Sequence, residues 1–137
     1  MEVGQPTWWK EATEHLAKDE LLGPVLAQYP DGSLLGKGDL FCTLVRSIVG
    51  QQISVLAADA VWGRLETFLG EVKPATIREK QPEELAACGL SRSKASYIHG
   101  LAEQSEALLS PDWSAMDDKA IHAHFTSFRG IGPWTSE

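Results

Sequence analysis

Residues 128–135 read Phe128-Arg129-Gly130-Ile131-Gly132-Pro133-Trp134-Thr135, and this stretch decides the fold. Two glycines interrupt a helical pattern, and Pro133 suits the first position of a new helix, where its missing amide hydrogen costs nothing. We predict a helix, a tight G-x-G turn and a second helix. The amides at the second start would face an anion, and beside Arg129 the expected ligand is a backbone phosphate. Taken alone, the short motif more often marks an ordinary helical hairpin turn.

Upstream of this stretch the apolar residues recur at helical spacing nearly throughout, and no alternating run is long enough for a strand. We therefore predict an all-α fold. The predicted helices cover residues 8–18, 21–29, 40–50, 55–69, 82–88, 92–109 and 118–128. The predicted N-terminal caps are Thr7, Asp19, Asp39, Ser54, Ser91 and Asp117. The residues expected to share the buried face of the helix over 40–50 are Phe41, Leu44, Val45, Ile48 and Val49.

Composition limits the class of protein. The chain has 137 residues, 43% of them hydrophobic, and a formal net charge of −7, which predicts a globular domain with no membrane span. Its start lacks the features of a signal peptide, so we expect a cytoplasmic, nucleoid-associated or nuclear protein and no secretion. Cys42 and Cys88 are too few for a disulfide scaffold or a four-cysteine cluster. The acidic balance, taken alone, argues against nucleic-acid binding.

Two further segments carry polar groups at helix boundaries. Gln51 and Gln52 stand between two apolar helices, where their amides either face a nucleic-acid groove or simply solvate a turn. Ser91, Arg92 and Lys94 stand at a helix start, where the two cations oppose the helix dipole. This start is interpreted either as a backbone-phosphate contact or as a capped surface helix.

Residues 44–54, 88–95 and 128–135 together resemble the helix-hairpin-helix DNA glycosylases, specifically the 3-methyladenine DNA glycosylase II branch, which excises alkylated bases. The three stretches follow the family's order and approximate separations. The resemblance implies an all-α glycosylase fold, truncated here after the hairpin. Residues 39–137 would form the six-helix barrel subdomain ending in the hairpin, and residues 1–38 would form helices that pack with a missing C-terminal part.

The resemblance also implies site residues. The residues expected to hold a DNA phosphate are Arg129, Gly130, Gly132 and Thr135, with a monovalent cation on the hairpin carbonyls and no metal bound by side chains. Trp134 would line the pocket for the flipped base, and Gln52 would enter the duplex where that base was. Ser91, Arg92 and Lys94 are further candidates for contacts with the DNA backbone. No cofactor is expected, and the expected partner is double-stranded DNA carrying an alkylated base.

The chemistry of this branch suits the residues present. An alkylated purine is cationic and leaves readily, and an electron-rich ring such as Trp134 attracts it by about 0.5 to 2 kcal/mol. Relatives that also cut the DNA backbone place a Schiff-base lysine at the position of Trp134, so the resemblance favours a monofunctional N-glycosylase. Cleavage then requires a carboxylate that stabilises the developing oxocarbenium sugar.

The resemblance implies that this carboxylate is an aspartate beyond residue 137. Asp112, Asp117 and Asp118 precede the hairpin and are better explained as caps and first-turn acids. His122 and His124 stand two apart on a helix, which disfavours a shared metal. We therefore expect no catalytic residue in this chain, no base excision by it alone, and self-association through apolar surface that the missing part would cover.

Two other classes of function remain as alternatives. One is a non-catalytic helix-hairpin-helix module that holds DNA or a partner protein. The other is a helical protein-interaction domain without a role on DNA. Downstream sequence would separate the enzyme from the first of these, and binding to abasic-site DNA would separate it from the second.

Overall fold

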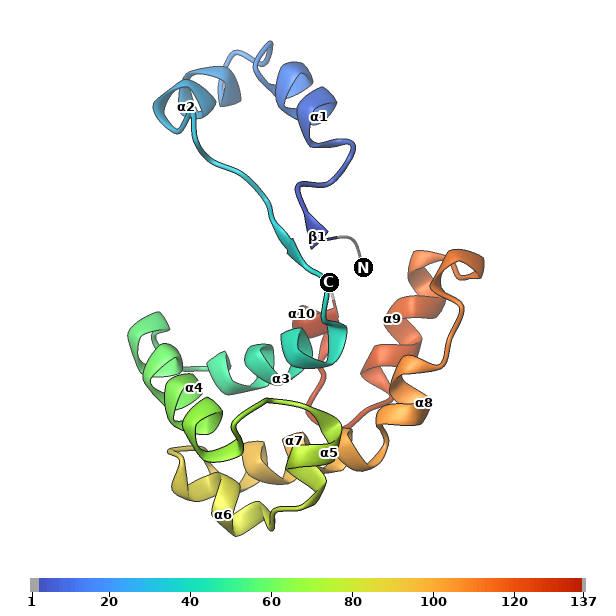
Figure 1. Ribbon diagram of the computed structural model, residues 1–137. Coiled ribbons are helices and arrows are strands. Elements are labelled where there is room, and N and C mark those ends of the chain that lie inside the picture. The colour runs from blue at the N-terminus through green and yellow to red at the C-terminus, as the bar shows by residue number, and fades with distance from the viewer. Residues whose placement is uncertain (1–2, 137) are drawn as a thin grey trace. The chain divides into compact units, whose positions relative to one another are not determined.

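The computed structural model describes residues 3–136, and the chain divides into two compact units, one up to Leu40 and one from Phe41 onward. Figure 1 follows the helices of each unit along the chain. The boundary expected from the sequence lies slightly earlier, after residue 38. Each unit is described by itself.

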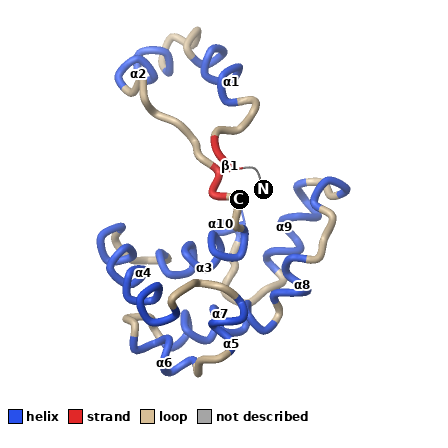
Figure 2. Tube along the Cα trace, viewed as in Figure 1, coloured by secondary structure: helices blue, strands red, loops and turns tan. Residues whose placement is uncertain are grey.

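The first unit holds two short helices between two very short strands. These elements are β1 (Val3–Gly4), α1 (Trp9–Leu16), α2 (Leu22–Gln28) and β2 (Gly36–Lys37). The strands pair antiparallel and are drawn red in Figure 2. This pairing was not predicted, because two residues are too few to show an alternating pattern. Neither helix contains a fully buried residue.

The second unit is entirely helical, and the predicted all-α class is confirmed. Its elements are α3 (Leu40–Gly50), α4 (Val55–Leu69), α5 (Pro74–Arg78), α6 (Pro82–Ala87), α7 (Arg92–Glu103), α8 (Ser105–Leu109), a 3-10 turn (Trp113–Ala115), α9 (Asp118–Thr126) and α10 (Pro133–Ser136). Both α5 and α6 pack against α7, and α9 packs against α10. Among residues 3–136, no helix has the length and hydropathy that crossing a membrane requires.

The core of this unit contains the face predicted for α3. All five residues of that face are buried, and Val45, Ile48 and Val49 have no exposed surface. On α7 the residues facing the core are Ala95, Ile98, Leu101 and Ala102. Burying such side chains contributes about 1.5 to 3 kcal/mol for each larger aliphatic residue, so α3 and α7 form the rigid centre of the unit.

Several predicted helix boundaries are confirmed and others are wrong. Ser54, Ser91 and Asp117 cap α4, α7 and α9 with their side chains. Thr7 is not the cap of α1, whose N-cap is Trp8 without a side-chain hydrogen bond.

The single helix predicted over 92–109 is broken at Gln104, whose backbone leaves the helical conformation. Ser105 and Leu108 are nevertheless buried beyond the break, so core contacts rather than helix propensity fix the direction of α8. The helix α5 was not predicted, because five residues are too short to display a helical period.

Candidate nucleic-acid interface

The turn between α9 and α10 is held between two buried apolar residues. Phe128 and Ile131 are 7% and 4% exposed, and the Ile131 amide donates to the Phe128 carbonyl at 3.1 Å. Gly130 between them adopts φ 98°, a conformation that disfavours any side chain. The predicted helix, tight turn and second helix beginning at Pro133 are confirmed.

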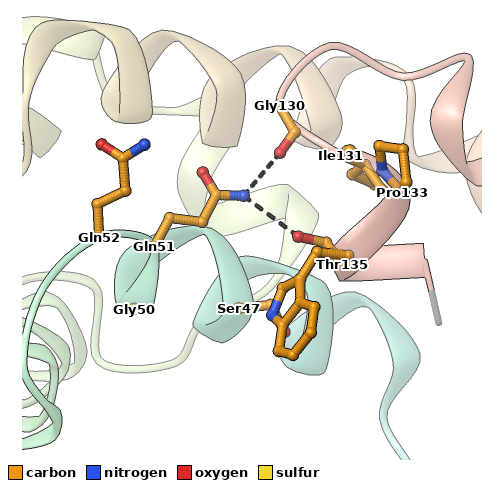
Figure 3. A pocket seen from close by; sticks show the side chains of 10 residues that line it. Ser47, Gly50, Gln51, Gln52, Gly130, Ile131, Pro133 and Thr135 are labelled. Carbon is orange, nitrogen blue, oxygen red and sulfur yellow. Dashed lines mark hydrogen bonds between the residues drawn. The ribbon is translucent and has the colours of Figure 1, made fainter.

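Together the hairpin and the turn after α3 enclose one pocket. Its volume is about 820 Å³, and it is lined by Ser47, Gly50, Gln51, Gln52, Gly130, Ile131, Gly132, Pro133, Trp134 and Thr135 (Figure 3). Two of the three motifs singled out in the sequence therefore meet in space. Among residues 3–136, the lining includes no carboxylate and no cation, so the polar character there comes from amides, hydroxyls and backbone groups.

The side chain of Gln51, which the sequence predicted either to face a groove or to solvate the turn, instead joins the two halves of this pocket. The Gln51 amide nitrogen donates to the Gly130 carbonyl at 2.9 Å and to the Thr135 hydroxyl at 3.3 Å (Figure 3). These partners lie about 80 positions away along the chain, so no local pattern could have indicated the contact. Gln51 therefore links the turn after α3 to the first glycine of the hairpin and to Thr135 in α10.

The neighbouring Gln52 has a different environment. Its backbone adopts φ 58°, the one left-handed conformation at a non-glycine residue in the described part of the chain. The side chain is exposed and takes no part in the bonds that Gln51 makes. Ile53, Val55 and Leu56 follow it and are also exposed, at 42%, 77% and 84%. The turn thus presents a polar side chain beside an apolar surface.

The third motif meets the same turn through Lys94. Its ammonium nitrogen donates to the Val49 carbonyl at 2.8 Å and to the Gln51 carbonyl at 2.6 Å, at the end of α3. Burial lowers the pKa of Lys94 below its ordinary value. The ammonium is therefore engaged by protein carbonyls, whereas Arg92 is exposed. The Ser91 hydroxyl caps α7 and is exposed. Contacts of Ser91 and Arg92 with a DNA backbone stay predictions.

Arg129 and Trp134 are two long exposed side chains of the hairpin. The Arg129 guanidinium lies over the Tyr97 ring, 5.5 Å from the ring centre. Trp134 is 88% exposed, although an indole is among the least soluble side chains, and it borders the pocket. An exposed aromatic ring next to an amide-lined pocket is the arrangement that stacking on a base requires.

The histidines and aspartates that the sequence disfavours as metal ligands or catalytic acids have hydrogen-bond partners within the protein. His122 shares a 2.7 Å hydrogen bond with the Ser136 hydroxyl, and His124 one of 3.1 Å with the Leu108 carbonyl. The side chains of Asp112 and Asp117 accept from backbone amides as caps, which confirms that interpretation. In the described part of the chain, no three potential metal ligands gather.

A family model described as the HhH-GPD superfamily of base excision DNA repair proteins matches residues 45–137. Among curated proteins, DNA-3-methyladenine glycosylase 1 of Schizosaccharomyces pombe is 25% identical, with 82% of this chain and 52% of the relative covered. DNA-3-methyladenine glycosylase of Saccharomyces cerevisiae is 31% identical, with 92% and 49% covered. The chain thus spans about half the length of these curated relatives.

Two solved structures have a similar fold. The 3-methyladenine DNA glycosylase of Schizosaccharomyces pombe in complex with abasic DNA matches with a TM-score of 0.77, 25% identity, and 92% and 66% of the two chains covered. The 3-methyladenine DNA glycosylase of Archaeoglobus fulgidus matches with a TM-score of 0.74, 25% identity, and 93% and 48% covered.

Proposed function

Because the chain belongs to the HhH-GPD superfamily of base excision DNA repair proteins, we propose that it provides the DNA-binding half of a monofunctional N-glycosylase of the 3-methyladenine DNA glycosylase II type. Its ligand is double-stranded DNA with an alkylated base such as 3-methyladenine. The observation that carries the proposal is the single pocket shared by the hairpin of residues 130–135 and the turn of residues 50–52. The inferred location is with the DNA, in the nucleus or the nucleoid.

The hairpin is the proposed phosphate-binding element. Gly132 has open space where a side chain would begin, so a phosphate can approach the backbone closely there. Arg129 and the Thr135 hydroxyl add donors from the two sides. The carbonyls of Phe128 and Gly130 each accept one protein hydrogen bond and keep a lone pair, which leaves room for a monovalent cation as a ligand of the hairpin.

Trp134 is the proposed platform for the flipped base. The base must leave the stack before cleavage, and a damaged pair makes that step cheaper. A cationic base then gains attraction from the exposed indole face. Trp134 carries no amine, so it cannot form the Schiff base of a bifunctional lyase. Gln52 is the proposed side chain that fills the gap in the duplex, since it projects from an exposed turn at the rim of the same pocket.

In the part of the chain that the structure describes, no carboxylate lines the pocket, and Asp112 and Asp117 are engaged as helix caps. We therefore propose no residue among 3–136 as the carboxylate needed for cleavage. We expect the 137-residue chain to bind a duplex containing a tetrahydrofuran abasic site and to release no 3-methyladenine from methylated DNA. Release at an enzyme-like rate would show that a group in this chain is catalytic.

The same binding assay separates the alternative of a non-catalytic module. A module that merely holds DNA binds abasic and intact duplexes equally, because phosphate contacts carry no information about the base. A glycosylase half prefers the abasic duplex. Equal affinities at about 0.1 M salt would favour the module, and absence of binding at low salt would favour a protein-interaction domain.

We further propose that the chain self-associates through its first unit. Between residues 21 and 35 of this unit, six large apolar side chains are 46% to 82% exposed, namely Leu21, Leu22, Val25, Tyr29, Leu34 and Leu35. Exposed apolar residues gathered in one short segment are a common cause of association. Sedimentation tests this, with a concentration-dependent increase in mass expected and a constant monomer mass counting against it.

A further inference from the structure

The end of α3 is completed by a side chain from another helix. The last carbonyls of a helix have no partner within it and attract cations because of the helix dipole. Here Lys94, from the first turn of α7, donates to the carbonyls of Val49 and Gln51. The backbone that presents Gln52 is therefore fixed by a contact reaching across more than 40 residues of the chain.

Gln51 carries this connection on to the hairpin. Its carbonyl accepts from Lys94, and its side-chain amide donates to Gly130 and Thr135. Gly130 in turn packs on Tyr97, which lies three positions after Lys94 on α7. Residues at this spacing lie on one side of a helix. One short segment of α7, from Lys94 to Tyr97, thus contacts both the turn after α3 and the hairpin.

We propose that Lys94 and Gln51 are positioning residues that hold the Gln52 turn in register with the phosphate-binding hairpin, and we refer to this pair as the Lys94–Gln51 bridge. The inference rests on the function proposed above. The bridge fixes how far the inserted side chain stands from the gripped phosphate, so it sets discrimination between abasic and intact DNA. Neither residue needs to touch DNA for this role.

The conformation of Gln52 explains why such support is needed. A left-handed backbone is sterically unfavourable at a residue with a Cβ and persists where the surroundings enforce it. Gln51 immediately precedes Gln52 and is held in two directions, because its carbonyl accepts from Lys94 and its side-chain amide donates to the Gly130 carbonyl. Without it, we expect the turn to relax and the Gln52 side chain to lose its fixed direction.

The first test is a double-mutant cycle on the full chain. Gln51→Met keeps side-chain length and neutrality but removes the donor, and Gln52→Ala removes the inserted side chain. The readout is the ratio of Kd for intact duplex to Kd for tetrahydrofuran duplex. We expect each single variant to lower this ratio by about threefold to tenfold, and the double variant to lower it scarcely further, because coupled residues are non-additive.

Matched controls separate positioning from general damage. Gln104→Met is the control for Gln51→Met, because it removes a side-chain amide that donates to a carbonyl, here that of Gly100, at the end of α7. Lys119→Met is the control for Lys94→Met, because it removes an exposed lysine on α9. We expect both controls to keep the wild-type ratio. Independent, additive losses for Gln51→Met and Gln52→Ala would overturn the proposed bridge.

Hydrogen exchange gives a second test that needs no DNA. In Gln51→Met and in Lys94→Met we expect faster exchange both at the amides of residues 51–53 and at those of 131–136, with α5 and α6 unchanged. Faster exchange confined to one of these segments would overturn the bridge. If the wild-type chain shows no preference for abasic DNA, the proposed function fails, and the exchange result still decides whether the bridge couples the two segments.

Discussion

Gly130 lies so close to Tyr97 that a Cβ added to the glycine would stand 2.6 Å from the tyrosine Cβ and 2.7 Å from its Cγ. The contact joins the hairpin to α7 through backbone, which no side chain at position 130 could reproduce. A Cβ added in the same way to Gly132, two residues later, would have no atom of the described residues beyond its chain neighbours within 4 Å. The two glycines of the G-x-G turn therefore have different physical reasons for lacking a side chain.

Gly130→Ala is expected to destabilise the chain. The positive φ costs about 1 to 2 kcal/mol, and the clash with Tyr97 adds about 1 to 3 kcal/mol. Gly132→Ala is expected to leave stability nearly unchanged and to weaken DNA binding, because its Cβ would occupy the approach of the phosphate. Thermal unfolding and binding to abasic duplex measure the two effects. The reverse assignment, with Gly132→Ala the less stable variant, would contradict this account of the turn.

Trp134→Ala is expected to weaken preference for a cationic base without affecting stability. An 88% exposed side chain supports little of the fold, so the stability change should stay within about 0.5 kcal/mol. The preference for a 7-methylguanine duplex over a guanine duplex should decrease by about 2- to 30-fold in Trp134→Ala. In Trp134→Phe the preference should be intermediate between that of the wild-type chain and that of Trp134→Ala.

Trp113→Ala provides the comparison. Trp113 stacks on Phe125 at a ring separation of 5.3 Å, so its loss should reduce stability and leave the preference intact. If Trp134→Ala kept the full preference, the base pocket would have to lie elsewhere.

The salt dependence of the proposed DNA binding should be shallow, because the chain is acidic and the proposed phosphate contacts are largely backbone amides. Each phosphate neutralised by a cation contributes about −0.9 to the slope of log K against log salt concentration. Arg129→Gln is expected to make the slope less steep by about one. Arg78→Gln makes the same change of charge at an exposed position on α5, outside the hairpin, and should leave the slope unaltered. Equal effects of the two variants would indicate diffuse attraction rather than a defined contact.

The start of α2 should depend on pH through Asp19. Hydrogen bonds from the Leu22 amide and then the Leu21 amide hold the pKa of this carboxyl below its usual 3.8. A lowered pKa means that the contribution is fully present above the unfolded pKa and is lost as pH falls through the folded one. We expect the Leu22 amide resonance to shift and α2 to lose helicity as the pH falls below the usual carboxyl value of 3.8. In Asp19→Asn this transition should be absent.

Local patterns were sufficient for the elements that bury one face. The spacing of Phe41, Leu44 and Val45 predicted the core side of α3, and cap residues such as Ser54 and Asp117 marked helix starts correctly. These features depend on neighbours three or four positions away. The break at Gln104 does not, because it depends on how α8 packs.

The site was only partly predictable for the same reason. Gln52 and the hairpin could be placed from their motifs, whereas the partners of Gln51 depend on tertiary structure. Lys94 is the clearest case. Its charge opposes the dipole of its own helix α7, which suggested an anion ligand. In the fold the same charge stabilises the carbonyl end of α3, a relation that no pattern within residues 88–95 reveals.

The left-handed backbone at Gln52 has an evolutionary consequence. Glycine would adopt φ 58° without strain, so selection for thermostability alone would drive this position toward glycine. Such a lineage would gain folding free energy and lose the long side chain at the rim of the pocket. The glutamine in this chain therefore forgoes folding free energy that a glycine at the same place would provide.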